Sequence, residues 1–449
     1  MIIDSVLINA KAYLKGEIVD CSFAIEEGKI LKIGKETHMP KADQKTDLHN
    51  LLVLPGVIDS HVHLRDEDKA YKESFLTGTA AAASGGVTTV LDMPNNSPLT
   101  MTSETLQNRM EIAERSALVN IGFYCQFPAN MDEIKAIAAK GAVGFKLFMA
   151  EPIGAINIDD DVTLVDAFKQ AAESDMPVAV HAEDHTLLKK TVDDFKLRHR
   201  DNMNAFLKAH DENVEAAAVD RLLQITAKIE KLQLHFCHVS TERALNAIAG
   251  DEKSGKAVTC EVTPHHLLLK KDDYEHLGPR ALTMPPLRTK ENVEALWKGI
   301  AEGTVDTIGS DHAPHALQEK DASSIWDVKV GIPGLETTLP LILTAVHQKR
   351  LTLAQAIKLL SERPAEIFQL ANRGNLGQDQ IADIVVVDFN QKYRLDASKF
   401  KSKAKFSPFD KWDAQGKIVK TYVNGRLIMD DDEIVAKPDS GNIIRRKRA

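Results

Sequence analysis

The sequence predicts an α/β protein: a (β/α)8 TIM barrel with a small β-sandwich domain formed by both termini. Three observations predict this fold. The chain has 449 residues, too many for one ordinary globular core and enough for a barrel with a smaller partner domain. Its middle alternates apolar strand patterns with helical patterns, whereas its two ends carry strand patterns without helices between them.

The two ends of the chain have the pattern of short β-strands. Near the N-terminus, strands are predicted at 5–7, 21–25 and 30–33, with a Glu27-Gly28 turn before the last of them. Near the C-terminus, apolar runs at 384–388 and 418–423 precede Asn424-Gly425, a strong hairpin signal. Two separate modules would also fit, but a closed barrel brings its ends together, which favours one shared domain. We therefore predict a barrel at 53–383 and a small domain built from 1–52 and 384–449.

The middle of the chain contains eight apolar strand patterns. They lie at 52–58, 88–93, 118–124, 143–148, 177–181, 232–238, 258–262 and 304–308. Amphipathic or alanine-rich helical patterns between them include 72–83, 103–116, 131–140 and 290–301. Eight β-then-α units is the number found in a TIM barrel. A doubly wound sheet is the alternative, but it does not explain why ionisable residues follow so many of these strands.

Composition excludes several classes of protein. Asp and Glu number 65 against 56 Lys and Arg, a formal charge of −9, which argues against nucleic-acid binding and favours a small-molecule ligand. The four cysteines are far apart and form no CxxC pair, so neither a disulfide framework nor a thiolate zinc site is predicted. Without a signal-peptide pattern or an apolar run of about 20 residues, we expect a cytoplasmic protein with no membrane contact. The basic run at 445–448 is typical of a solvated tail.

Histidines and an aspartate gather where the barrel strands end. In TIM barrels the reactive groups follow the C-terminal ends of the strands. His61 and His63 are two residues apart and share a face of an extended segment, which makes a chelating pair suited to zinc. His181 and His238 end two further strands, and Asp311 follows the eighth. A single histidine at a strand end is more often structural, but this combination predicts a metal site.

Lys146 lies inside a predicted strand that is buried on both faces. One interpretation is a lysine that reaches a buried carboxylate or the barrel rim. The other is that desolvation favours the neutral amine, which can add carbon dioxide. The resulting carbamate has two oxygens that can bridge two metal ions, which is the anion a two-metal site needs.

At this point the chain resembles a known family. The order and strand placement of the histidines, Lys146 and Asp311 resemble the binuclear amidohydrolase superfamily. Within it, nearly the whole chain is similar to the class I dihydroorotases. The similar stretches are PGVIDSHVHLR at 55–65, GGVTTVLDMPN at 85–95, CHVST at 237–241, EVTPHHL at 261–267, SDHAPH at 310–315 and GIPGLET at 331–337.

The resemblance implies a complete metal centre. His61, His63 and Asp311 would bind one Zn²⁺, and His181 and His238 a second. Carboxylated Lys146 and a hydroxide would bridge the two ions, with the hydroxide as the nucleophile. Asp311 would be the catalytic residue that carries a proton from the attacking oxygen to the leaving ring nitrogen. The implied reaction is the reversible hydrolysis of (S)-dihydroorotate to N-carbamoyl-L-aspartate in pyrimidine biosynthesis.

Residues that recognise the substrate are expected to separate the members of the superfamily. Arg65 follows His63 by two positions, and its guanidinium suits a carboxylate, which dihydroorotate carries and hydantoins, dihydropyrimidines and allantoin lack. The resemblance also implies substrate contacts from His63, Asn95, His315, Val330 and Gly331. Asn95 could instead be turn chemistry, and His315 a solvated loop residue.

Two alternative functions stay open. Met284 stands where many dihydroorotases have an asparagine, which keeps an allantoinase or hydantoinase type of cyclic amidohydrolase in view. The second alternative is an inactive barrel that serves as a scaffold for aspartate carbamoyltransferase, although all six implied metal ligands are present. Expected partners besides the small-molecule substrate are a second copy of the chain in a homodimer and aspartate carbamoyltransferase.

Overall fold

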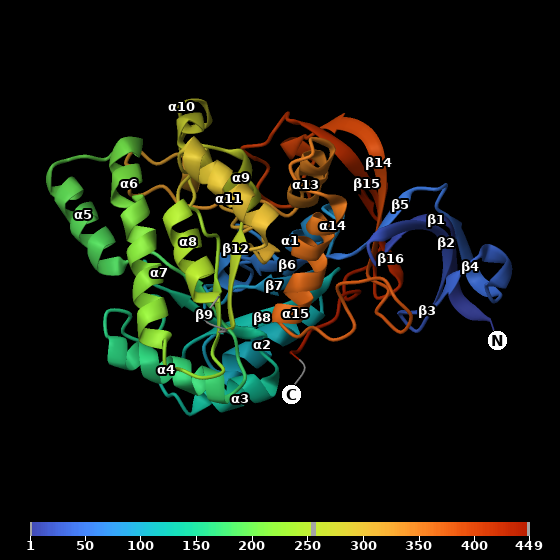
Figure 1. Cartoon of the computed structure of the whole chain (residues 1–449), viewed down its shortest axis with the longest axis horizontal. Helices are drawn as coiled ribbons and strands as arrows, with labels where there is room; N and C mark the ends of the chain where they lie inside the picture. The colour runs from blue at the N-terminus through green and yellow to red at the C-terminus, as the bar shows by residue number, and fades with distance from the viewer. Residues whose placement is uncertain (1, 253–256, 447–449) are drawn as a thin grey trace.

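The computed structural model describes residues 2–252 and 257–446. It confirms the predicted fold class, because eight parallel strands form a nearly closed barrel and both termini form a separate sheet beside it (Figure 1). Among the described residues, no helix combines the length and the apolar character that crossing a membrane requires.

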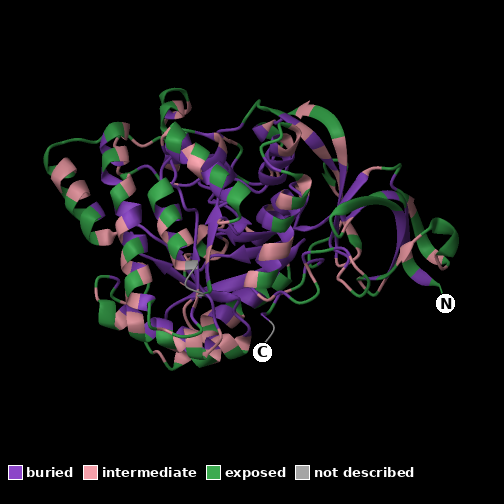
Figure 2. Ribbon diagram, in the orientation of Figure 1, coloured by how far each residue is buried: buried purple, intermediate pink, exposed green. Residues whose placement is uncertain are grey.

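The barrel strands follow one another in chain order around the ring. They are β6 (Val57–Val62), β7 (Val87–Asp92), β8 (Asn120–Gln126), β9 (Gly144–Phe148), β10 (Val178–His181), β11 (Gln233–Phe236), β12 (Ala257–Val262) and β13 (Thr307–Ile308). The ring closes between its first and last strands through a bridge from Val62 to His312, where the His63 amide donates to the His312 carbonyl at 2.8 Å. Most strand residues are buried because helices cover the outside and side chains fill the inside (Figure 2).

Helices surround the barrel and cover its rim. They are α1 (Phe75–Ser84), α2 (Ser103–Glu114), α3 (Glu133–Lys140), α4 (Asp161–Glu173), α5 (His185–Leu197), α6 (Met203–Ala209), α7 (Glu212–Thr226), α8 (Glu242–Glu252), α9 (Pro264–Leu268), α10 (Tyr274–Leu277), α11 (Lys290–Glu302), α12 (Leu317–Lys320), α13 (Thr338–His347), α14 (Leu353–Ile357) and α15 (Arg363–Ile367). Several begin at a side-chain cap: Ser74 and Thr102 form capping boxes, and Asp160 and Asp211 accept from the first-turn amides.

The terminal sheet contains strands from both ends of the chain, seen in blue and red on the right of Figure 1. Its strands are β1 (Ile3–Leu14), β2 (Glu17–Glu26), β3 (Lys29–Gly34), β4 (Ala42–Asp47), β5 (Leu52–Pro55), β14 (Ile384–Arg394), β15 (Asp413–Val423), β16 (Arg426–Asp430) and β17 (Glu433–Ile434). β5 joins the two halves, pairing with β1 on one side and β14 on the other. The small domain therefore depends on both termini at once.

Two details of the sequence interpretation were wrong. The strand predicted at 52–58 is two strands, because β5 belongs to the terminal sheet and β6 to the barrel, with Gly56 between them. The domain boundary at 52 remains a prediction, and the pairing of β5 favours placing it at Gly56. The predicted solvated tail is also incorrect for Arg446, which is buried and donates to Gln233. The remaining tail residues, 447–449, lie outside the described part.

Candidate active site

The predicted site residues meet at one end of the barrel. His61 lies in β6, His181 ends β10, and Asp311 follows β13, so their side chains reach the rim formed by the carboxyl ends of the strands. They border a cavity of about 720 Å³. The predicted residues that line it are His61, His63, Arg65, Asn95, His181, His238, Asp311, His315, Val330 and Gly331.

His61, His63 and Asp311 form the first group of candidate ligands. The Nε2 atoms of His61 and His63 lie 3.4 Å and 3.2 Å from Oδ1 of Asp311. Donor atoms of His61, His238 and Asp311 also lie within 4.8 Å of one another. His61 and Asp311 of the first group therefore lie next to His238, which belongs to the second group described below.

His181 and His238 form the second group. Nδ1 of His181 faces Nε2 of His238 at 3.0 Å. Nδ1 of His238 is buried and has no hydrogen-bond partner within the described ranges. The backbone of His238 has a φ of +37°, and Asp311 has a φ of +45°, values that non-glycine residues rarely adopt. Such conformations cost about 1–3 kcal/mol each and are typical of functional positions.

Hydrogen bonds orient three of the four histidines from behind. Nδ1 of His61 contacts Glu261 at 2.8 Å, and Nδ1 of His63 contacts the side-chain oxygen of Asn95 at 2.7 Å. Nε2 of His181 contacts Glu183 at 2.8 Å. Each of these contacts fixes which ring nitrogen turns toward the centre, as outer partners of metal-binding histidines do.

Burial and neighbouring charges keep the imidazoles of His61, His63 and His238 neutral. Burial, together with the nearby Lys146 charge, holds the pKa of His61 well below its ordinary value. Burial followed by the charge of Arg65 does the same to the pKa of His63, and burial followed by His181 to the pKa of His238. A neutral imidazole is the form that binds metal.

Lys146 lies beneath these ligands in β9 and is 0% exposed. Its Nζ atom donates to Sγ of Cys237 at 2.9 Å. Lys146 is therefore buried as predicted and is close enough to the histidines to influence the pKa of three of them.

The donor set fits zinc. Two ligand atoms on one tetrahedral Zn²⁺ with bonds of 2.0–2.1 Å lie about 3.3 Å apart. Three contacts between candidate ligands, His63 to Asp311, His61 to Asp311 and His181 to His238, measure 3.2, 3.4 and 3.0 Å. Neutral imidazoles and a carboxylate at this spacing can hold divalent metal ions without a change of fold.

Arg65 lines the same cavity and is buried. Its guanidinium donates to the Pro314 carbonyl at 3.3 Å and contacts Nε2 of His315 at 3.3 Å. No carboxylate lies at ion-pair distance from it anywhere in the part of the chain that the structure describes. Burial lowers the pKa of Arg65 to about 10, which still leaves the guanidinium charged at neutral pH. The wall therefore presents a buried cation suited to an anionic ligand.

The other predicted substrate residues have partners within the protein. Nε2 of His315 contacts the Val330 carbonyl at 2.9 Å, and its Nδ1 contacts Nζ of Lys72 at 3.1 Å. The Gly331 amide donates to Leu282, and its carbonyl accepts from the buried Lys320. These contacts place His315 and the 330–331 backbone firmly against the cavity, and their roles toward a substrate stay predictions.

Met284 packs into an apolar wall beside Leu188, Val192 and Trp326, and it lines the cavity. Unlike the asparagine that many dihydroorotases have at this position, the methionine side chain has no amide group to offer a ligand.

Sequence reasoning missed the residues that support the ligands. Glu261 begins the EVTPHHL stretch and pairs with His61, which is 200 residues away in the chain. Glu183 follows His181 by two positions and pairs with it locally. Lys72 also lines the cavity and pairs with Glu319 at 2.8 Å. The only available signal was that each is a charged residue close to a predicted strand end.

Comparisons with known proteins agree with this geometry. The amidohydrolase family model matches residues 52–428. A dihydroorotase from Methanosphaera stadtmanae is 36% identical over 415 residues, covering 91% of this chain and 93% of that protein. A dihydroorotase from Pyrococcus horikoshii is 35% identical over 454 aligned positions, covering 100% of this chain and 97% of that protein.

Among solved structures, the L-hydantoinase (dihydropyrimidinase) from Arthrobacter aurescens superposes with a TM-score of 0.94 at 30% identity, covering 99% of this chain and 100% of that one. The family match spans the barrel, and the two dihydroorotases match nearly the whole chain. The chain therefore belongs to the amidohydrolase family, and its sequence groups there with the dihydroorotases.

Proposed function

We propose that this chain catalyses the reversible hydrolysis of (S)-dihydroorotate to N-carbamoyl-L-aspartate. The observation that carries the substrate is Arg65, a buried cation that lines the same cavity as the candidate metal ligands. A ring carboxylate would pair with this guanidinium and place the cyclic amide toward the histidines. A substrate without a carboxylate would leave Arg65 buried and unpaired.

The proposal includes two zinc ions. His61, His63 and Asp311 would hold one of them, and His181 and His238 the other. Lys146, after its amine adds carbon dioxide and loses a proton, would provide the bridging carbamate. Zinc ions bound in this way polarise a carbonyl group and lower the pKa of water to about 7.

Asp311 is the proton carrier in this proposal. Its carboxylate lies 3.2 Å from His63 and borders the cavity, where it can accept the proton of the attacking hydroxide. The same oxygen then delivers that proton to the ring nitrogen as the carbon–nitrogen bond breaks, which leaves a carboxylate and a urea group. In the reverse direction the same transfers close the ring and release water.

Substrate comparison tests the proposed function. Zinc-loaded protein is expected to hydrolyse dihydroorotate and to leave allantoin and dihydrouracil nearly unreacted. Arg65→Met is expected to lower kcat/KM for dihydroorotate by about 10²–10³-fold, because a buried charge pair is lost. Arg65→Lys should recover only part of this loss, since an ammonium cannot make the bidentate contact.

Other outcomes of this comparison would change the conclusion. Turnover of allantoin or dihydrouracil with dihydroorotate inert would favour the hydantoinase type. Inertness toward all three with both metals bound would favour the scaffold.

The proposal also includes a homodimer and a complex with aspartate carbamoyltransferase. The particle mass in solution, measured alone and with that enzyme, tests both assemblies.

Gly331 provides a second prediction. Its φ is +129°, and a Cβ atom there would lie 2.5 Å from the Ala313 carbonyl, in the stretch that carries Asp311 and His315. Gly331→Ala is expected to lower kcat/KM by at least about tenfold, because displacement of site residues by 1 Å has effects of this order or larger. Gly303→Ala is the matched control: its φ is also positive, at +82°, but no atom lies within 4 Å. Steady-state kinetics and thermal unfolding of both variants test this prediction. Equal kcat/KM values for Gly331→Ala and Gly303→Ala would contradict it.

A further inference from the structure

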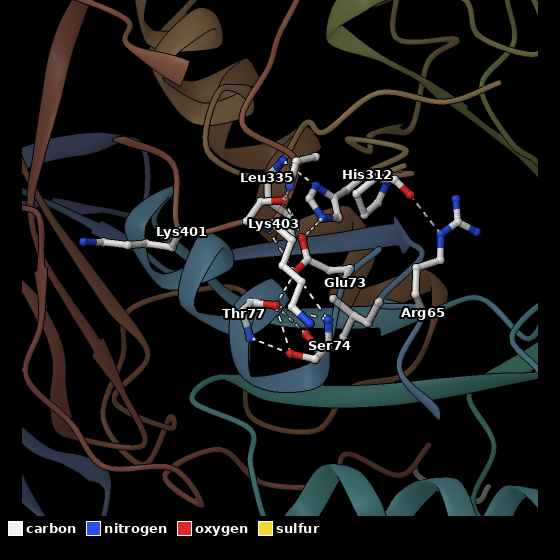
Figure 3. Close-up of polar contacts among 12 residues, drawn as sticks. Arg65, Glu73, Ser74, Thr77, His312, Leu335, Lys401 and Lys403 are labelled. Carbon is white, nitrogen blue, oxygen red and sulfur yellow. Dashed lines mark hydrogen bonds and ion pairs between the residues drawn. The ribbon is translucent and has the colours of Figure 1, made fainter. Parts of the chain in front are cut away.

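Glu73 is a buried carboxylate for which the proposed reaction has no use. It directly precedes the capping residue of α1 and is 0% exposed. Figure 3 shows its side chain between the start of α1, His312 and a segment of the C-terminal part of the chain. Burying a carboxylate is unfavourable unless it is well compensated, so its contacts indicate what it does.

Both carboxylate oxygens of Glu73 have partners. Oε1 accepts from the Ser74 amide at 3.3 Å, from the Lys403 amide at 3.4 Å and from the Thr77 hydroxyl. Oε2 accepts from the Ser402 hydroxyl and lies 3.5 Å from Nε2 of His312. Burial alone would raise the pKa of Glu73, but the contacts with His312, Ser402 and Thr77 lower it overall, so the group is a carboxylate at neutral pH.

His312 is oriented from two sides. Its Nδ1 accepts from the amides of Gly334 and Leu335, at 3.2 and 3.5 Å, which places the ring proton on Nε2. Nε2 makes no hydrogen bond among the described residues, and it faces Oε2 of Glu73 at the ion-pair distance of 3.5 Å (Figure 3). The carboxylate and the two amides therefore fix the rotation of the imidazole.

The backbone of His312 connects this network to the candidate active site. Its carbonyl accepts from the His63 amide at 2.8 Å, at the bridge that closes the barrel, and His312 directly follows Asp311. That hydrogen bond sets the relative position of two ligands, whose side chains approach to 3.2 Å. Asp311 also has its unfavourable φ of +45°, which persists only if its neighbours are held in place.

A distant segment reaches the same network. Ser402 and Lys403 contact Glu73, and the amides of Lys401 and Ser402 donate to Glu336, the residue after Leu335. The segment thus contacts the carboxyl groups of both Glu73 and Glu336, although it comes from the C-terminal part of the chain, between β14 and β15. These contacts give the C-terminal part a direct connection to the barrel rim.

We propose that Glu73 is a positioning residue, which holds Asp311 and His63 in register through His312 and couples the C-terminal segment 401–403 to the active site. Glu73 contacts no substrate and no metal ion in this role. The inference deepens the proposed function and rests on it for the identity of the reaction alone.

Glu73→Gln tests the proposal with little change of volume. The amide places an N–H group toward the Nε2–H of His312 or the Ser402 hydroxyl. We expect kcat for dihydroorotate to fall about 10–100-fold and zinc affinity to weaken by a similar factor, as for other outer partners of metal ligands. KM should stay within about twofold, because Arg65 is not touched. Hydrogen exchange should become faster in peptides covering His63 and Asp311.

Two further variants keep the test decisive. Asp383→Asn removes another buried carboxylate, which lies just before β14 and pairs with Arg373, and should lower the melting temperature without changing kcat or zinc affinity. Ser402→Ala removes the hydroxyl that donates to Glu73, leaves the Lys403 amide contact in place, and should lower kcat by at least about threefold.

The outcomes separate the two proposals. If Glu73→Gln and Ser402→Ala keep kcat, zinc affinity and hydrogen exchange within twofold of the wild type, the positioning role is overturned. If the wild type is inert toward dihydroorotate but zinc affinity and hydrogen exchange change in Glu73→Gln, the positioning role stands and the proposed reaction fails.

Discussion

Asp311→Asn is expected to lower kcat for dihydroorotate by about 10⁴-fold, near the upper end of what general acid–base catalysis contributes. The asparagine has nearly the same shape and still offers one oxygen toward His61 and His63. It cannot accept a proton from water at neutral pH, however, and so cannot deliver one to the ring nitrogen. The loss should appear equally in hydrolysis and ring closure, since both directions use the same carboxylate.

Steady-state rates in both directions, measured with zinc content determined on the same samples, check this expectation. Asp306→Asn is the matched control, because Asp306 lies just before the strand that Asp311 follows and pairs with Arg363 instead of facing the cavity. The control should lose stability and retain kcat. An Asp311→Asn enzyme that kept both metals and more than a tenth of the wild-type kcat would show that another group carries the proton.

The sequence was informative where the periodicity of a barrel determines position. Residues that follow strands of a parallel barrel must lie at one rim, so His61, His181 and Asp311 could be placed together without knowledge of any contact. The boundary at Gly56 could not be predicted in this way. An apolar run has the same pattern whether it belongs to one sheet or two, and only its pairing with β1 and β14 shows that β5 belongs to the terminal sheet.

Contacts between side chains of distant segments were beyond sequence reasoning. Glu261 and His61 are 200 residues apart in the chain, and Glu73 and Ser402 are 329 apart. No local pattern encodes which carboxylate approaches which histidine, because this depends on the stagger and tilt of the barrel strands. The chelating pair His61 and His63 was predictable because its spacing is local.

The fold does not separate the members of this family. The L-hydantoinase from Arthrobacter aurescens covers 99% of this chain with a TM-score of 0.94, although the dihydroorotases are more similar in sequence. The difference in substrate must therefore lie in a few side chains on the cavity wall. Arg65 is the strongest of these, since its buried charge would be costly opposite a neutral ring.

Lys146→Met is expected to give the second large effect, a loss of at least about 10³-fold in kcat, because in the proposed mechanism several kcal/mol of charge stabilisation depend on a bridged metal pair. Methionine cannot form a carbamate, so bound zinc should fall below two ions per chain. The fold should survive, since an unbranched apolar side chain replaces a fully buried one of similar length. On one preparation, metal analysis measures the zinc content, circular dichroism the retention of the fold, and steady-state kinetics the loss of kcat.

Chemical rescue distinguishes a missing carbamate from general damage at Lys146. Lys146→Ala leaves space beside His61 and His238 that a short carboxylic acid can enter, and its two oxygens can replace those of the carbamate. Added acetate or propionate is therefore expected to restore zinc binding and part of kcat. Lys320→Ala is the matched control: Lys320 is also 0% exposed, but its amine donates to three backbone carbonyls, so carboxylic acids should restore nothing there. Full activity of Lys146→Met, or equal rescue of both alanine variants, would contradict a bridging carbamate, because neither result depends on the Lys146 amine.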